Sequence, residues 1–328
     1  MKRRYIALSL LGVAGAALYL NNASWLATPH REAPYLISHR GVHQTFDPVG
    51  VGPDDCTATL IDPPQHGFIE NTLPSMESAF AAGASRVEID IHPTTDGEFA
   101  VFHDWTLDCR TDGTGVVRQH SMATLRTLDA GYGYTADGGE TWPLRGTAVG
   151  AIPTLGEVLA AFPERDFLIN IKSNDADEAD WLLRYLDARA VDTDRLIVVA
   201  APRSDARLAE LRPELRRMSR ARVRACGLSY LAWGWSGHVP EACHDTVLVL
   251  PANYARLAWG WPTRLEARMA SVGSEVWVMG DLDRTTMNST GIDTVDQRDA
   301  LPSRFRGGIM TNRIERIGPT SQGRTDAE

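Results

Sequence analysis

The sequence has few cysteines and no excess of positive charge. Of its 328 residues four are cysteine, and no Cys-x-x-Cys pair occurs, so a zinc site or a thioredoxin-like redox motif of that kind is not predicted. Acidic residues outnumber basic ones, 42 against 33, and the net charge of −9 argues against a protein that coats nucleic acid. This charge still permits a small anionic substrate in a locally basic pocket.

The remaining composition is that of an ordinary globular protein. Hydrophobic residues make up 43% of the chain and charged residues 23%. These proportions exclude a disordered or collagen-like chain. The length is near the upper limit that a single hydrophobic core supports.

The amino terminus has a pattern of its own. Lys2, Arg3 and Arg4 precede a mostly apolar, uncharged run over Tyr5–Leu20, which at about 16 residues is shorter than the ~20 that span a bilayer. The pattern predicts a signal peptide or signal anchor within residues 1–27, and the alternative is a buried helix. Because basic residues stay on the cytoplasmic side, we expect an exported, periplasmic or otherwise extracytoplasmic chain, either released or tethered to the inner membrane.

Export would allow the cysteines to pair. Four cysteines in an oxidising compartment permit two disulfides among three connectivities. We favour Cys226–Cys243, which closes a short loop, and Cys56–Cys109, which joins two loops near the motifs below. In the cytosol all four would instead be thiols.

Short β-prone runs alternate with longer helical patterns. The expected strands are Tyr35–His39, Arg86–His92, Phe99–His103, Phe167–Lys172, Arg195–Ala200, Ala221–Ala225, Thr246–Leu250, Glu275–Met279 and Gly308–Thr311. The expected helices are Leu73–Ala82, Thr154–Phe162, Asp177–Ala190, Ser204–Arg217, Pro262–Val272 and part of Asp283–Met287. This alternation predicts a mainly parallel sheet in a (β/α)8 TIM barrel. A doubly wound open sheet is the alternative, although no Gly-rich phosphate turn follows the first strand.

Nine expected strands are one too many for this barrel. The link Pro93–Glu98 is too short for a crossover helix, so either one strand lies outside the barrel or the barrel is irregular there. Segments 43–69 and 129–152 are rich in Gly, Pro and Asp and are expected to be functional loop insertions. We expect the barrel domain over residues 33–318 and a flexible tail over 319–328.

Several expected strands end in ionisable side chains, although buried parallel strands should be nearly all apolar. Glu88 and Asp90 are two apart on one strand, so they point the same way and repel each other unless a cation is present. A hard divalent ion, Mg2+ or Ca2+, suits such oxygen ligands, and Asn170 can add a carbonyl oxygen. The alternative is an exposed acidic edge strand.

Two cationic side chains and two histidines also lie at the ends of expected strands. Arg40 and Lys172 can bind a phosphate, or they can form salt bridges with neighbouring carboxylates. His39 and His103 titrate near neutral pH and could serve as general base and general acid on the two sides of a metal-bound phosphate. The alternative for each histidine is a structural role.

Taken in order, these residues resemble the glycerophosphodiester phosphodiesterase family from about residue 36 to 315. The matching motifs are His39-Arg40-Gly41, Glu70-Asn71-Thr72, Glu88-Ile89-Asp90, His103-Asp104, Arg110-Thr111, Gly113-Thr114-Gly115, Ile152-Pro153-Thr154-Leu155-Gly156-Glu157, Asn170-Ile171-Lys172 and Thr311-Asn312-Arg313. The resemblance implies a TIM barrel that uses a divalent cation and is related in architecture to phosphatidylinositol-specific phospholipases C.

The resemblance also implies individual roles. It makes His39 and His103 the acid/base pair, Glu88 and Asp90 metal ligands, Arg40 and Lys172 phosphate contacts, Glu70 and Asn71 a supporting pair, and Trp277 an aromatic lining of the glycerol pocket. The chain departs from the family in three places. Asn170 stands where a glutamate ligand is common, Asn312 replaces an aspartate, and the loop between His39 and Glu70 is longer and carries Cys56.

The implied activity is metal-dependent hydrolysis of glycerophosphodiesters to glycerol 3-phosphate and an alcohol. One alternative is a phospholipase D or C type phosphodiesterase that acts on lysophospholipids, which the amino terminus and the Trp-rich segments Trp233-Gly234-Trp235 and Trp259-Gly260-Trp261 would suit. Another is an exported binding barrel with weakened catalysis, suggested by Asn170 and Asn312. The sequence leaves the oligomeric state open.

Overall fold

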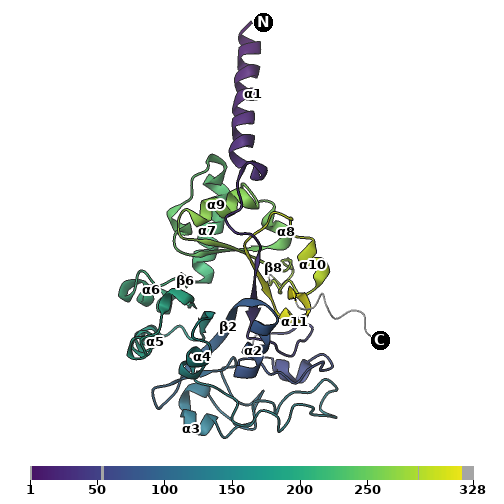
Figure 1. Cartoon of the computed structure of the whole chain (residues 1–328), viewed down its shortest axis with the longest axis vertical. Helices are drawn as coiled ribbons and strands as arrows, with labels where there is room; N and C mark the ends of the chain where they lie inside the picture. Colours follow the sequence, from purple (N-terminus) through teal and green to yellow (C-terminus); the bar gives the residue numbers. More distant parts are fainter. Residues whose placement is uncertain (1, 53–54, 287, 320–328) are drawn as a thin grey trace. The chain divides into compact units, whose positions relative to one another are not determined.

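The computed structural model describes residues 2–52, 55–286 and 288–319. The chain forms two compact units (Figure 1). Unit 1 comprises Met1–Tyr35 and Met218–Met310, and unit 2 comprises Leu36–Arg217 and Thr311–Glu328. The expected tail over 320–328 lies outside the described residues.

Unit 2 is built on a parallel sheet. Its parallel strands are β1 (Tyr35–His39, of which the first residue belongs to unit 1), β2 (Ala84–Pro93), β4 (Asp166–Ile171) and β5 (Leu196–Val199), in the order β5-β4-β2-β1. Its helices are α2 (Leu73–Ala81), α3 (Met122–Leu125), α4 (Leu155–Ala161), α5 (Ala176–Ala188), α6 (Pro202–Leu211) and α11 (Ile314–Ile317). Capping boxes at Thr72 and Thr154 satisfy the first amide groups of α2 and α4 and so set where these helices begin.

Unit 1 contains three parallel strands in the order β9-β8-β7. They are β7 (Val247–Pro251), β8 (Glu275–Met279) and β9 (Gly308–Thr311), of which the last residue belongs to unit 2. The helices are α1 (Lys2–Asn22), α7 (Arg220–Trp233), α8 (Ala252–Ala255), α9 (Thr263–Ala270) and α10 (Val295–Asp299). The short strand β6 (Arg217–Met218) spans the boundary between the units.

The strand count resolves to eight βα repeats. β3 (Phe99–Val101) pairs antiparallel with β2 across the short link and lies off the path of the other strands. In the described part of the chain the other eight strands follow one another with helices between them, as a (β/α)8 barrel requires. The surplus strand of the prediction is therefore the antiparallel hairpin arm at β3.

Three predicted elements differ from the structure. Ala221–Ala225 is not a strand but part of α7, which Ser219 caps by accepting a hydrogen bond from the Arg222 amide. The helix expected over Ser204–Arg217 ends at Leu211, because Pro213 follows, and Arg217 is already in β6. Residues 284–286 form a turn rather than a helix, and Met287 lies outside the described residues.

The two insertions of unit 2 pack together. Residues of segments 43–69 and 129–152 share a small apolar core with the loop that follows β3. This core includes Ala58, Ile61, Ile69, Phe102, Leu107, Val117, Leu125, Tyr134, Leu144 and Ile152. A disulfide between Cys56 and Cys109 fastens the first insertion to that loop, and Cys226 is bonded to Cys243, so both predicted pairs are confirmed.

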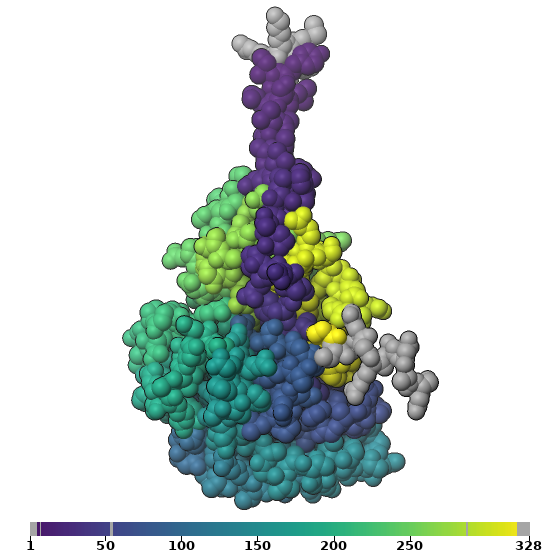
Figure 2. Space-filling model, in the orientation of Figure 1, coloured from purple at the N-terminus to yellow at the C-terminus, as the bar shows by residue number. Residues whose placement is uncertain are grey.

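The first helix is apolar and largely exposed (Figure 2). Tyr5, Leu11 and Val13 are each more than 60% exposed. Among the described helices, none is both long enough and apolar enough to cross a membrane. The carboxyl end of α1 is joined to the rest of unit 1, where Arg268 donates hydrogen bonds to the Asn22 side chain and the Asn21 carbonyl.

Candidate active site

The first site residues follow directly from the end of β1. Arg40 has a positive φ of 58°, and Gly41 follows at 80°, so the chain turns sharply after His39. A Cβ on Gly41 would lie 2.5 Å from Ser75 Oγ and 2.8 Å from the Ser75 carbonyl carbon, so only glycine fits against α2. This turn directs His39 and Arg40 to the carboxyl end of the sheet.

His39 has a polar group near each ring nitrogen. Its Nδ1 lies 2.8 Å from Asn312 Oδ1, and its Nε2 lies 3.7 Å from Glu88 Oε2. Because Asn312 Oδ1 only accepts, Nδ1 carries the proton and Nε2 of the neutral ring is the acceptor. Burial and the charge of Arg40 hold the pKa of His39 well below its usual range.

Arg40 joins two buried carboxylates. Its Nε lies 3.2 Å from Asp90 Oδ2, and its Nη1 donates to Glu70 Oε1 at 3.1 Å. Burial alone would raise the pKa of Glu70, but Arg110 and Arg40 outweigh that effect and hold this pKa well below its usual range. Glu70 is therefore ionised and paired.

Glu88 and Asp90 share one face of β2 but differ in their partners. Asp90 lies beside Arg40, 3.3 Å from Lys172 Nζ, and accepts hydrogen bonds from the side-chain amides of Asn71 and Asn170. Burial would raise its pKa, yet His103, Arg40 and Lys172 hold it well below the usual range. Glu88 Oε2 is buried and accepts no hydrogen bond, and burial together with Asp90 raises the pKa of Glu88 to about 8.

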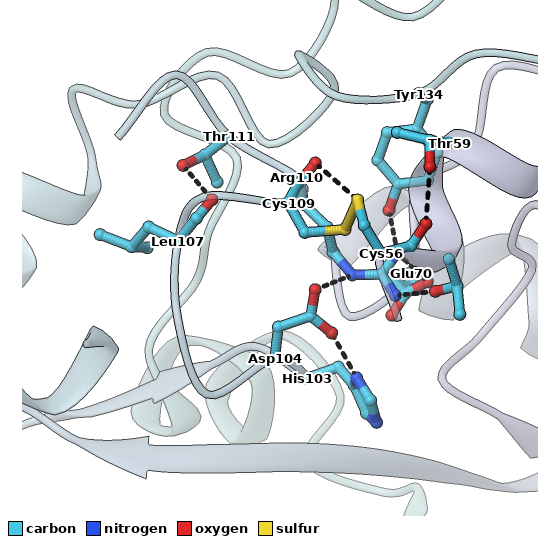
Figure 3. Close-up of a disulfide and its surroundings, with 11 residues drawn as sticks. Cys56, Thr59, Glu70, His103, Asp104, Leu107, Cys109, Arg110, Thr111 and Tyr134 are labelled. Carbon is cyan, nitrogen blue, oxygen red and sulfur yellow. Dashed lines mark hydrogen bonds and ion pairs between the residues drawn. A yellow bond between two sulfur atoms is a disulfide. The ribbon is translucent and has the colours of Figure 1, made fainter. Parts of the chain in front are cut away.

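His103 is hydrogen-bonded to the first of three charged side chains that follow one another (Figure 3). Its Nδ1 lies 2.6 Å from Asp104 Oδ1, and Asp104 Oδ2 lies 2.8 Å from Arg110 Nε. Arg110 Nη1 in turn donates to Glu70 Oε2 at 3.0 Å. Burial and the charge of Arg40 lower the pKa of His103, so the ring is neutral at pH 7 with its Nδ1 proton on the Asp104 side.

The structure brings together most of the residues singled out in the sequence. Burial lowers the pKa of both His39 and His103, and the charge of Asp90 opposes this lowering in each, so both imidazoles lie within electrostatic reach of one carboxylate. The group that gathers there consists of His39, Arg40, Glu70, Asn71, Glu88, Asp90, His103, Asn170 and Lys172. All belong to unit 2.

Trp277 lies in the other unit. It stands in the middle of β8, fully buried, and its Nε1 donates to the Glu275 carboxylate at 2.7 Å and the Tyr35 hydroxyl at 2.9 Å. Its part in a glycerol pocket stays a prediction.

Several contributing residues had no role assigned from the sequence. Asp104 and Arg110 belong to motifs that were recognised, yet only the folded loop shows that they bond to each other. His43 lies edge-on to His39 with ring centroids 5.8 Å apart, and buried His92 has a pKa lowered by desolvation to about 4. The period-two pattern of Glu88, Asp90 and His92 could have placed His92 on the same face.

The donor set fits a divalent cation through its oxygens. Among the described residues no three His, Cys, Asp or Glu side chains are grouped to hold a metal ion. The buried Glu88 Oε2, which has no hydrogen bond, is nevertheless an oxygen that a cation would satisfy. Asp90 and Asn170 carry oxygens on neighbouring strands that are paired at these positions.

Replacing Glu88 by glutamine tests its environment. With metal ions chelated, Glu88→Gln is expected to be more stable than the wild-type protein at pH 8, by on the order of 2 to 4 kcal/mol. The folded pKa of about 8 lies above the ordinary value of 4.5, so the stabilising protonated form is fully present below pH 4.5 and is lost as the pH rises through 8. Urea unfolding at several pH values measures this. A stability difference that does not change with pH would contradict it.

Comparison with known proteins first defines the fold. The solved glycerophosphoryl diester phosphodiesterase domain of an uncharacterized Mycobacterium tuberculosis protein covers 89% of this chain and is itself wholly covered, with a TM-score of 0.62 and 18% identity. A phosphodiesterase from Oleispira antarctica, solved in complex with the product sn-glycerol-3-phosphate, has a TM-score of 0.52 and 19% identity over 90% of this chain and 98% of its own. The fold is a (β/α)8 TIM barrel with loop insertions.

The sequence then defines the family. The model of the glycerophosphoryl diester phosphodiesterase family matches residues 39–218, more than half of the chain, which therefore belongs to this family. A glycerophosphodiester phosphodiesterase from Caldanaerobacter subterraneus subsp. tengcongensis is 37% identical over 103 residues, 31% of this chain and 39% of that protein. The chain thus spans less than half the length of the curated relatives it matches.

Proposed function

We propose that this chain hydrolyses glycerophosphodiesters to glycerol 3-phosphate and an alcohol. The observation that supports this most is the grouping of two neutral imidazoles and two cations, Arg40 and Lys172, around Asp90. The family membership and the product held by the Oleispira antarctica neighbour favour the same substrate class.

The two imidazoles supply the proton transfers. The Nδ1–H of His103 donates a hydrogen bond to Asp104, and the Nδ1–H of His39 donates one to Asn312. Each neutral ring therefore presents Nε2 as an acceptor. One histidine accepts the proton of the nucleophile at Nε2. The other takes up a proton from solvent at Nε2 and gives it to the leaving alkoxide. In line with the family resemblance, the first nucleophile is the glycerol hydroxyl beside the phosphate, which gives a cyclic phosphodiester that water then opens.

The cations bind and polarise the phosphodiester. Arg40 and Lys172 both face Asp90, so a phosphate close to this carboxylate can exchange contacts with them. Glu88, Asp90 and Asn170 would hold Mg2+ or Ca2+, which when bound withdraws charge from the phosphate oxygens. Glu70 and Asn71 fix Arg40 and Asp90 respectively and so support both groups.

Hydrolysis of glycerophosphocholine tests the proposal. We expect release of glycerol 3-phosphate by the full chain, loss of this release after chelation, and recovery when Mg2+ or Ca2+ is added back. Absence of turnover on all soluble glycerophosphodiesters, with either ion present, would contradict it.

Asn170→Glu tests the metal ligands. The added carboxylate is expected to tighten divalent-ion binding by about 10-fold or more, because ligand charge increases affinity at an oxygen site. Isothermal titration with Mg2+ and Ca2+ measures this, with Asn174→Glu, a nearby loop position, as the control. Unchanged or weaker binding would argue against Asn170 as a ligand.

A second candidate function is a phospholipase D or C type reaction on lysophospholipids. Trp233 and Trp235 of unit 1 are 57% and 46% exposed, and such aromatic side chains favour a membrane interface. Relative turnover of lysophosphatidylcholine and glycerophosphocholine separates the two. A third candidate is a binding barrel, for which the phosphodiester would bind without being hydrolysed.

We also propose an extracytoplasmic location, with 1–27 as signal peptide or anchor. The two disulfides support this, since such bonds persist in oxidising compartments. Fractionation of cells expressing the full chain measures it, and recovery with cytosolic markers would contradict it.

A further inference from the structure

The Cys56–Cys109 disulfide is next to the Arg110 network (Figure 3). Each bridged cysteine immediately precedes a member of that network, because Thr57 follows Cys56 and Arg110 follows Cys109. Arg110 Nη2 donates to Thr57 Oγ1 at 2.7 Å. The bridge and this hydrogen bond therefore join the same two chain segments twice.

Arg110 connects the carboxylate that contacts His103 with the carboxylate that contacts Arg40. It is 3% exposed, and it contacts Asp104, Glu70, the Tyr134 hydroxyl and Thr57. Asp104 orients His103, and Glu70 orients Arg40. A displacement of this one guanidinium would therefore affect both partners.

The segments joined by the bridge have little regular structure to fix them. Cys56 lies in the first insertion, immediately before a 3-10 turn over Thr57–Leu60, and Cys109 lies in the loop after β3. Gly133 backs this loop so closely that a Cβ there would lie 1.8 Å from the Cys109 carbonyl oxygen. Both the disulfide and the Gly133 backbone thus contact the Cys109–Arg110 segment.

From these contacts we propose that the Cys56–Cys109 disulfide, acting through Arg110 and Thr57, is a positioning element that sets the orientation of Asp104 and hence of His103. The inference rests on the proposed function for its kinetic consequence. It assigns no chemical step to the cysteines. In the absence of the bridge, the Arg110 side chain would adopt several conformations, and the Asp104 carboxylate would no longer be held in a single orientation.

Removal of each disulfide in turn provides a matched test. Cys56→Ser/Cys109→Ser is expected to lower kcat by about 10-fold or more, with KM on glycerophosphocholine within about twofold, as for loss of the group that orients a functional histidine. Cys226→Ser/Cys243→Ser is the control, since none of the described contacts of these cysteines is to a site residue. Its kcat is expected within about twofold of wild type, at a temperature where both variants are folded.

Two further variants separate positioning from a general loss of stability. Thr57→Val keeps the disulfide and removes only the hydroxyl that Arg110 contacts, and it is expected to lower kcat in the same direction. In an Asp104→Asn background, removal of Cys56–Cys109 is expected to change kcat by less than about twofold, because the two changes act through one contact. Independent, multiplying losses would overturn the inference, as would equal effects of the two disulfides.

The orientation of His103 can be read without turnover. Nitrogen-15 NMR of the histidine rings, with the His103 signal assigned from a His103→Gln variant, reports which ring nitrogen carries the proton. The Nδ1-protonated form is expected in the wild type and a mixture of tautomers in Cys56→Ser/Cys109→Ser. If the wild type is inactive but the tautomer changes in the variant, only the proposed function is refuted. If the wild type is active and neither the tautomer nor kcat changes in the variant, only the inference is refuted.

Discussion

His103→Ala is expected to lower kcat by about 100- to 10,000-fold, the usual contribution of a positioned general acid or base. His103 is neutral, holds its Nδ1 proton toward Asp104 and presents Nε2 for proton transfer. Because the imidazole acts on the reacting groups rather than on substrate affinity, KM for glycerophosphocholine is expected to change by less than about threefold. Steady-state kinetics of the folded variant measures both.

The control is His120→Ala in the same unit. The His120 ring contacts only the Thr114 carbonyl oxygen among the hydrogen bonds described, outside the site, so its removal is expected to leave kcat within about twofold. Unchanged turnover in a folded His103→Ala protein would remove this histidine from the mechanism. His39→Ala is expected to behave as His103→Ala does.

Arg40→Gln is expected to lower both stability and turnover. Arg40 is the shared cation of Asp90 and Glu70, and its loss leaves these two buried carboxylates with one fewer partner each. Breaking such a buried pair costs about 3 to 5 kcal/mol of unfolding free energy. Removing the guanidinium that would contact the phosphate is expected to lower kcat by a further factor of about 100 to 1,000.

Arg86→Gln is the matched control on β2. Arg86 is also buried, but Asp166, one of the groups it pairs with, is 38% exposed on its side chain, so water can solvate that carboxylate when the arginine is removed. We expect a smaller loss of stability and turnover within about twofold of wild type. Urea unfolding and steady-state kinetics of both variants measure the difference, and equal effects on turnover would contradict a special role for Arg40.

Much of the fold follows from local patterns. Tyr35–His39, Glu275–Met279 and Gly308–Thr311 are strands with the predicted bounds, because each is a short β-prone run between breaks. Ala221–Ala225 failed because it is too short to distinguish a strand from one turn and a half of a helix. In the structure β6 is only two residues long, and Ser219 directly after it caps α7.

In the candidate site, too, local spacing predicts some features and only the folded structure shows others. Glu88 and Asp90 had to share a face once they were on one strand, and the spacing of Asn170 and Lys172 followed the same rule. The sequence could not show that Asp90 is surrounded by Arg40, Lys172 and two amides while Glu88 Oε2 has no hydrogen bond. That difference arises from contacts between strands and loops far apart in the chain.

By itself the sequence determined the alternation of strands and helices, the motif residues of the family and the pairing favoured for the four cysteines. Only the tertiary structure decided that β3 runs antiparallel, that Trp277 is bonded to Glu275, and that Arg110 links Asp104 to Glu70 beside a disulfide. The physical reason is the separation along the chain of the residues that interact. Periodicity and spacing specify which side chains share a face, whereas the partners of a buried charge are chosen by segments that meet only when the chain has folded.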